Sequence, residues 1–127
     1  MRENEVAKII VDVAYQIHTK LGPGLLESVY EAVMKYELRK RGLRAENQVP
    51  IPVEWDGERM DVGFRADLLV ENCVIVELKS IEAVAPVHKK VLLTYLRIAD
   101  RRLGLLINFG VELIKNGISR VANNLKE

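Results

Sequence analysis

Two runs of branched apolar residues dominate the middle of the sequence, and only two polar residues separate them. The runs are Leu68–Val70 and Cys73–Val76, with Glu71-Asn72 in between. Short β-branched runs bounded by a polar pair predict two strands joined by a tight turn. The chain is therefore expected to build its sheet around a strongly apolar hairpin.

Three ionisable residues flank this hairpin, although a buried strand has little reason to hold them unless they meet something charged. Asp67 precedes the first run, and Glu77 and Lys79 follow the second. Glu77 and Lys79 are two residues apart, so their side chains leave the same face of the strand. A two-residue turn would put Asp67 and Glu77 on opposite faces, whereas a three-residue loop or a bulge near Glu71 to Cys73 puts them on one face. We predict the second arrangement.

A metal site follows from that prediction. Two carboxylates at roughly 5 Å repel by about 3 kcal/mol at an effective dielectric near 20, and a divalent cation removes the repulsion. Carboxylate oxygens, with the nearby carbonyl of Leu78, suit Mg²⁺ or Mn²⁺. Lys79 would position an attacking water or stabilise a developing negative charge. The alternative is a plain ion pair between Asp67 and Lys79, with Glu77 in solvent at a strand end.

Helices and further strands are expected on both sides of the hairpin. Apolar residues from Val6 to Leu21 recur on one helical face, and this helix ends at Gly22-Pro23-Gly24. The other expected elements are a helix over 25–41, an edge strand with two prolines over 48–55, a strand over 59–70 after a turn at 56–57, a strand over 73–80, a helix over 86–99, a strand over 103–109, and a short strand or helix near the C-terminus. This order predicts an α/β fold, a mixed central sheet flanked by helices, as a single domain over residues 1–127.

Composition excludes several classes of protein. The chain has 127 residues and a net charge of +1, so any basic surface for nucleic acid must be local. The lone Cys73 excludes an internal disulfide and a cysteine-based zinc site, and we expect a buried core thiol inside a strand. No stretch approaches the ~18 apolar residues of a membrane span. The start, MRENEVAK, lacks the apolar core of a signal peptide, so we expect a cytoplasmic protein.

A second stretch carries a resemblance. GPGLLESVYE places Gly24, Glu27 and Tyr30 in the spacing G-x-x-E-x-x-Y. With the D…E-x-K hairpin and the segments QVPIPV, VIVELK and GLLINFG, the chain resembles the GxxExxY family, a branch of the PD-(D/E)XK nuclease-like superfamily, over nearly its whole length. The resemblance implies a restriction-endonuclease-like core and metal-dependent hydrolysis of phosphodiester bonds in nucleic acid, with Mg²⁺ or Mn²⁺ as the cofactor.

The resemblance also implies a role for each matching residue. Asp67 and Glu77 match the acids that hold the metal, and Lys79 matches the catalytic lysine. Glu27 matches a helix-borne acid that helps to complete the site. The expected metal ligands are therefore Asp67, Glu77, Glu27 and the carbonyl of Leu78.

Other helical residues have both a functional and a structural interpretation. Glu27 shares a helical stripe with Tyr30, which places it beside apolar neighbours, but a carboxylate near a helix N-terminus is also favoured by the dipole alone. Tyr30 is an accessory candidate or a core aromatic with a bonded hydroxyl. His18 is an accessory candidate or an imidazole that contacts carbonyls at a helix end. His88 and Tyr95 are accessory candidates on the third helix.

The third helix departs from the pattern of related nucleases at one position. His88, Val91 and Tyr95 lie on one helical stripe. Related nucleases often have Q-x-x-x-Y here, and Val91 stands where that glutamine would be. A valine cannot hydrogen-bond to a water or a phosphate. The alternative function is therefore a catalytically weak or inactive nuclease-fold module that binds nucleic acid or a protein partner.

Basic residues on the third helix are candidates for contact with phosphates. Lys89, Lys90 and Arg97 would flank the metal site, although solvated helix faces commonly carry such residues. Aromatic residues make up only 6% of the chain, which argues against a platform for stacking single-stranded bases. A domain of this size could need a second subunit to hold a duplex, so a homodimer is one expectation.

Overall fold

A computed structural model describes residues 2–126 of the chain and has three helices and five strands in that range. The order is α1 (Glu3–Leu21), α2 (Glu27–Lys40), β1 (Ala45–Trp55), β2 (Glu58–Val70), β3 (Val74–Lys79), α3 (Pro86–Ala99), β4 (Leu103–Asn108), the short 3-10 helix η1 (Ile114–Asn116) and β5 (Ile118–Ala122). The predicted order is confirmed, and the element near the C-terminus is both a helical turn and a strand. No helix in the described range is long and apolar enough to cross a membrane.

The five strands form one mixed sheet in the order β1-β2-β3-β4-β5. Only β3 and β4 are parallel, and α3 makes the crossover between them. The other neighbouring pairs are antiparallel. β1, with Pro50 and Pro52, lies at an edge of the sheet as predicted. Proline has no backbone N–H to donate to a neighbouring strand, so it is tolerated at an edge but not in the centre of a sheet.

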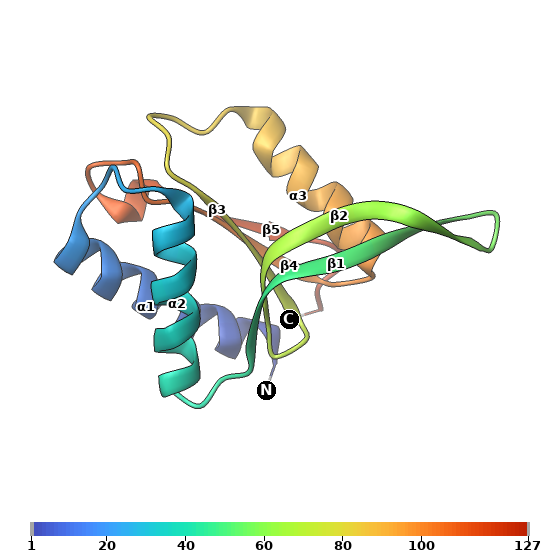
Figure 1. Ribbon diagram of the computed structural model, residues 1–127, viewed down its shortest axis with the longest axis horizontal. Helices are drawn as coiled ribbons and strands as arrows, with labels where there is room; N and C mark the ends of the chain where they lie inside the picture. Colours follow the sequence, from blue (N-terminus) through green and yellow to red (C-terminus); the bar gives the residue numbers. More distant parts are fainter. Residues whose placement is uncertain (1, 127) are drawn as a thin grey trace.

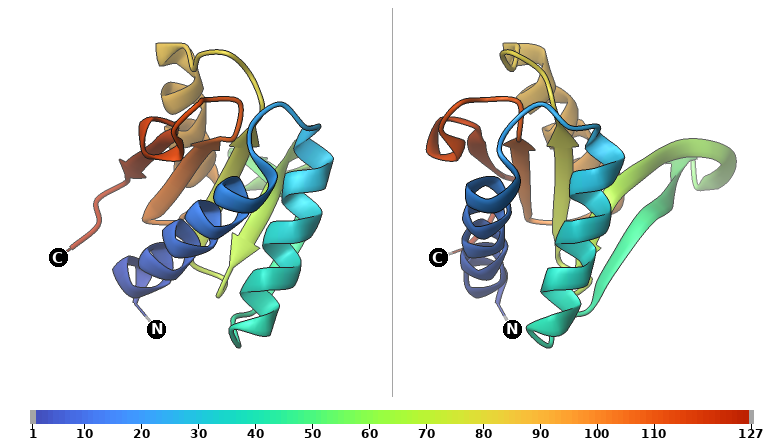
Figure 2. Two further views of the ribbon diagram at one scale, coloured as in Figure 1. Left: turned by 90° about the vertical axis from the view of Figure 1, so that its left-hand side faces the viewer. Right: turned by 60° about the vertical axis from the view of Figure 1, so that its left-hand side comes forward.

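Helices cover both faces of this sheet (Figures 1 and 2). α1 and α2 lie together against one face, where the larger core contains Ile10, Tyr30 and Leu38 above Val76 and Leu78. A smaller core lies under α3 on the other face; it contains Ala66, Leu69, Ile75, Leu92, Leu96 and Leu106. Alternation along β3 thus sends Leu78 toward α1 and α2 and its odd-numbered neighbours toward α3.

The loop between β2 and β3 decides which face the acids occupy. The last pair of the ladder is Val70 with Val74, so the connection is the three-residue loop 71–73. This odd length places Asp67 opposite Glu77, and the prediction that the two acids share a face is confirmed. The expectation for Cys73 is wrong in one respect: it is partly buried, but it lies in the loop and not inside the strand.

β1 and β2 continue beyond the sheet as a two-stranded ribbon, which we call the arm (residues 52–63; Figure 1). No residue of the arm is buried, and Trp55 and Val62 are 70% and 73% exposed. Gly63 permits the close approach of the two strands, because a Cβ at this position would lie 2.0 Å from the carbonyl oxygen of Ile51. The predicted turn at 56–57 lies at the tip of this arm.

Candidate active site

Asp67 and Glu77 lie where β2 and β3 separate, a point that we call the fork. The ladder between these strands ends at the pair Leu68 and Val76. Just beyond it, the backbone N–H of Asp67 donates to Oε1 of Glu77 at 3.3 Å, and the N–H of Leu78 donates to Oδ2 of Asp67 at 2.8 Å. At the end of the ladder, the two carboxylates thus accept hydrogen bonds from backbone N–H groups of the opposite strand. These two bonds hold the carboxylates of Asp67 and Glu77 close to each other.

The electrostatics of the fork favour a proton or a cation between the acids. Burial, and next the neighbouring charge of Asp67, raise the pKa of Glu77 from 4.5 to about 8, while the bond from the Asp67 N–H and the charge of Lys79 act in the opposite direction. The alternative of an Asp67–Lys79 ion pair is wrong, because the ion pairs within residues 2–126 are Arg44–Glu46 and Arg102–Asp100. Glu77 is also partly buried and not in open solvent.

Tyr95 approaches the fork from α3. Its ring stacks on Phe64 of β2, with the ring centroids 3.8 Å apart and the planes 6° apart. Burial, and then the charges of Glu77 and Asp67, raise the pKa of its phenol, so both acids lie within electrostatic reach of the ring. Of the accessory candidates, Tyr95 is the one that the structure associates with the acids. Val91, one turn earlier, is 40% exposed.

Tyr30 holds the loop that precedes α2. Its hydroxyl donates to the carbonyl of Gly22 at 2.6 Å and accepts from the N–H of Leu25 at 3.1 Å, and its ring stacks on Phe109 at 4.3 Å. The hydroxyl of Ser80, just after β3, donates to the carbonyl of Leu25. The structural interpretation of Tyr30 therefore applies: it is a core aromatic that ties the glycine-rich loop to the end of the strand that carries Lys79.

Glu27 begins α2 and is exposed, at a helix N-terminus where the dipole alone favours a carboxylate. Residues 2–126 contain no group of three or more His, Cys, Asp or Glu side chains that could hold a metal ion. Glu27 is thus not gathered with Asp67 and Glu77 into a three-acid set in this structure. After the loop anchored by Tyr30, α2 starts at residue 27 instead of 25.

The two histidines make structural contacts. Nε2 of His18 donates to the carbonyl of Val111 at 2.8 Å, and the buried ring packs near Phe109. This contact joins the end of α1 to the loop after β4, in agreement with the carbonyl-contact alternative. Nδ1 of His88 accepts from the N–H of Ala85 at 3.0 Å and so caps the start of α3. The basic candidates Lys89, Lys90 and Arg97 are exposed on the same helix.

Sequence reasoning missed three polar residues around the fork. Gln48 of β1 lies across from Asp67, since the flanking pairs are Asn47 with Leu68 and Val49 with Ala66. Glu31 of α2 accepts from Nε2 of Gln48 at 2.7 Å. Asn108 is fully buried and bonds through its amide to both the N–H and the carbonyl of Ile81, which fixes the loop after Lys79. A buried asparagine at the end of an apolar strand is a signal that could have been noticed for Asn108.

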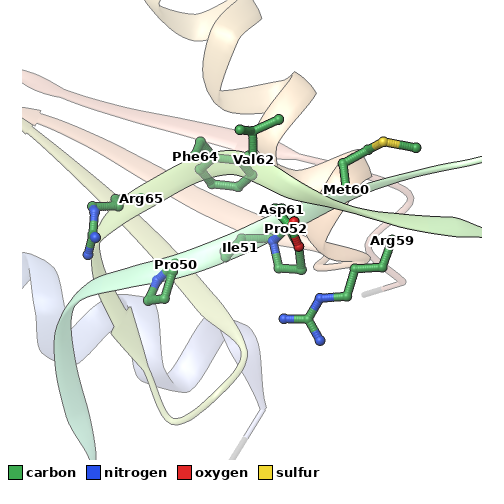
Figure 3. Close-up of a pocket in the computed structure, with 10 residues that line it drawn as sticks. Pro50, Ile51, Pro52, Arg59, Met60, Asp61, Val62, Phe64 and Arg65 are labelled. Atoms are coloured by element: carbon green, nitrogen blue, oxygen red, sulfur yellow. The ribbon is translucent and has the colours of Figure 1, made fainter.

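A hollow of about 420 Å³ lies on the arm and not at the fork (Figure 3). Prolines, glycine and two arginines line much of it, and Figure 3 shows Arg59 and Arg65 on the opposite side of the ribbon from Val62. The arm itself carries four acids and one arginine, a balance that does not attract phosphate. The fork is therefore the candidate site.

A family model covers nearly the whole chain. A model described as the PD-(D/E)XK nuclease superfamily matches residues 4–121. The chain belongs to this superfamily. Glu77-Leu78-Lys79 has the (D/E)XK form that gives the PD-(D/E)XK superfamily its name, and Ala66 stands where the name has proline before Asp67. No curated protein and no solved structure gives a match.

Proposed function

We propose that this chain is a metal-dependent nuclease that hydrolyses phosphodiester bonds in nucleic acid at the fork. The observation that carries the proposal is the pair of facing carboxylates, with the pKa of Glu77 raised to about 8 by burial and by Asp67. Buried carboxylates with a purely structural role are usually paired with a lysine or arginine of the same protein. Here Lys79 is near enough to lower the pKa of Glu77 but forms no ion pair with either acid within the described range.

The donor set fits a hard divalent cation that keeps several of its waters. Oxygen atoms of Asp67 and Glu77 would hold Mg²⁺ or Mn²⁺, with the Leu78 carbonyl as a further ligand and Glu27 acting through water. Such a cation would supply Lewis acidity toward the phosphate. Binding would also offset the burial and the repulsion by Asp67, which together favour a proton on Glu77 in the metal-free protein.

Lys79 is the proposed catalytic residue that is not a ligand. It follows Glu77 by two positions on β3, and the backbone N–H of Phe109 donates to its carbonyl at 2.8 Å, which fixes this end of the strand. An ammonium group at this place would orient the attacking water or stabilise the charge that develops on the phosphate. The exposed Lys89, Lys90 and Arg97 of α3 would contact flanking phosphates.

Calorimetry with Mn²⁺, combined with cleavage assays on DNA and RNA, tests the proposal. Asp67→Asn and Glu77→Gln should each weaken Mn²⁺ binding at least tenfold and remove cleavage, because each deletes a charged ligand. Lys79→Ala should leave Mn²⁺ binding nearly unchanged while removing cleavage. Glu27→Gln should have a smaller effect on binding than either fork acid, since Glu27 lies outside the pair.

A wild-type protein that binds no Mn²⁺ at millimolar concentrations and cuts neither DNA nor RNA would exclude nuclease activity. The alternative function, a module that binds nucleic acid or a protein partner without hydrolysis, would then be the one to accept. Val91, in place of the glutamine of related nucleases, is the feature that favours that alternative.

A further inference from the structure

Gln48 has a backbone conformation that is unusual for the middle of a strand. It lies within β1, between two residues that pair regularly with β2, yet its φ is +51°. This left-handed region is sparsely populated by residues other than glycine, asparagine and aspartate. The other non-glycine residues with positive φ in the described range lie in turns, caps or loops; they are Asp56, Glu71, Asn72, Asp100 and Asn124. Gln48 is thus a strained position inside a ladder, directly across from Asp67.

The side chain of Gln48 uses this position to join two carboxylates on different elements. Its Nε2 donates to Oε1 of Glu31 at 2.7 Å and to Oδ1 of Asp67 at 3.4 Å. The other oxygen of Glu31 accepts from Nδ2 of Asn47 at 3.2 Å, so two neighbouring β1 side chains hold this acid. The other oxygen of Asp67 accepts from the Leu78 N–H. Both oxygens of Asp67 are therefore engaged, one from β3 and one from β1.

We propose that Gln48 is a positioning residue that holds the Asp67 carboxylate in the orientation used at the fork, and that Glu31 holds Gln48. The proposal rests on the proposed function for its chemical purpose. An amide suits this task because it donates a hydrogen bond without carrying charge. A lysine or arginine at position 48 would neutralise Asp67 and compete with a cation, whereas the amide leaves the full negative charge of the carboxylate available.

The two properties of Gln48 can be separated by substitution. Gln48→Gly removes the amide and also relieves the left-handed backbone, so it should keep or raise the melting temperature while weakening Mn²⁺ binding about tenfold. Asp56→Gly is the matched control: Asp56 has nearly the same φ, +52°, but lies at the tip of the arm. It should change the melting temperature in the same direction and leave Mn²⁺ affinity and cleavage unchanged.

A second pair of variants tests the link to Glu31. Glu31→Ala should weaken Mn²⁺ binding in the same direction as Gln48→Gly but less, because Gln48 keeps its reach to Asp67. The double variant should bind no more weakly than Gln48→Gly alone, since the two residues act through one hydrogen bond. Gln48→Asn adopts positive φ readily but is one methylene shorter, and it should give an intermediate affinity if Gln48→Gly does not fold.

Crystal structures of the metal-free proteins complete the experiment. We expect one Asp67 conformer in the wild type and a displaced or divided side chain in Gln48→Gly. Unchanged Mn²⁺ affinity with an unchanged Asp67 conformer overturns the positioning role. If the wild type neither binds Mn²⁺ nor cleaves nucleic acid, the proposed function fails, and the Asp67 conformer in Gln48→Gly still decides the positioning role: movement supports it and an unchanged conformer overturns it.

Discussion

The two halves of β2 belong to one continuous strand but differ in burial and in the number of strands that they pair with. Residues 68–70 pair on both sides, with β1 and β3, and all three are buried. Residues 58–63 pair only with β1 in the arm, and none of them is buried. The first half is part of the core, and the second is a two-stranded ribbon of a kind that is only marginally stable by itself.

The candidate site lies at the boundary between these halves. A strand that stayed paired with β3 throughout would leave no backbone N–H for the carboxylates at the fork. A strand that left earlier would lose the rigid core beside them. Asp67 follows directly on the buried Ala66 and precedes the buried Leu68, so its backbone is fixed while its side chain remains available. The core half thus supplies rigidity, and the departure of β2 from β3 leaves the N–H groups of Asp67 and Leu78 to the two carboxylates.

The largest expected effect separates the two halves by stability. Leu68 is fully buried in the core beneath α1 and α2, and Leu68→Ala should lower the free energy of unfolding by about 2–5 kcal/mol. Val62 is 73% exposed on the arm, and Val62→Ala should change it by less than about 0.5 kcal/mol. Denaturant titrations of the two variants measure both values. Similar losses from the two substitutions would mean that the arm is packed against something and is not a free ribbon.

A second expected effect is the pH dependence of the metal-free protein. The pKa of Glu77 is raised to about 8, so the folded state binds this proton more tightly than the unfolded chain does. Stability from this group is complete below pH 4.5, falls by at most about 1.4 kcal/mol per pH unit between 4.5 and 8, and then levels off. Glu77→Gln should flatten this part of the profile, and Mn²⁺ should stabilise the wild type most above pH 8. The same slope in Glu77→Gln would assign the effect to another group.

Local sequence patterns are sufficient to predict the helices, the strands and the shared face of the two acids. They are insufficient to predict the exact register between paired strands. Apolar periodicity and the Gly-Pro punctuation located the helices, and the parity of the loop at 71–73 put Asp67 and Glu77 on one face. The sequence predicts Gln48 only as part of an edge strand. The turn at 56–57 pairs Trp55 with Glu58, and that register alone would place Gln48 across from Arg65. The irregularity between Pro52 and Glu54 shifts the register by two residues, so that Gln48 lies across from Asp67, and no local pattern predicts this shift.

Helix starts show the same limit on a smaller scale. Glycine and proline at 22–24 correctly indicated a break, but the hydroxyl of Tyr30 decides where α2 resumes, through its bonds to Gly22 and Leu25. Contacts between side chains and backbone across a loop depend on packing against Phe109, which lies far away in the sequence.

The smallest expected effect concerns the helix that faces the core half of β2. Val91 lies one turn before Tyr95, the residue that stacks on Phe64 and lies within reach of the acids' charges. Val91→Gln would place an amide at the position where related nucleases carry one, so we expect a several-fold increase in cleavage rate. Because Val91 is 40% exposed, the amide can remain solvated, and the free energy of unfolding should change by less than about 0.5 kcal/mol.

Val87→Gln is the matched control one turn earlier, at 55% exposure, and should leave the rate unchanged. Steady-state cleavage of a labelled duplex by the three proteins measures the difference. Equal rates for all three, in a protein that measurably cleaves, would show that α3 stabilises the core half of β2 without taking part in the chemistry at the fork.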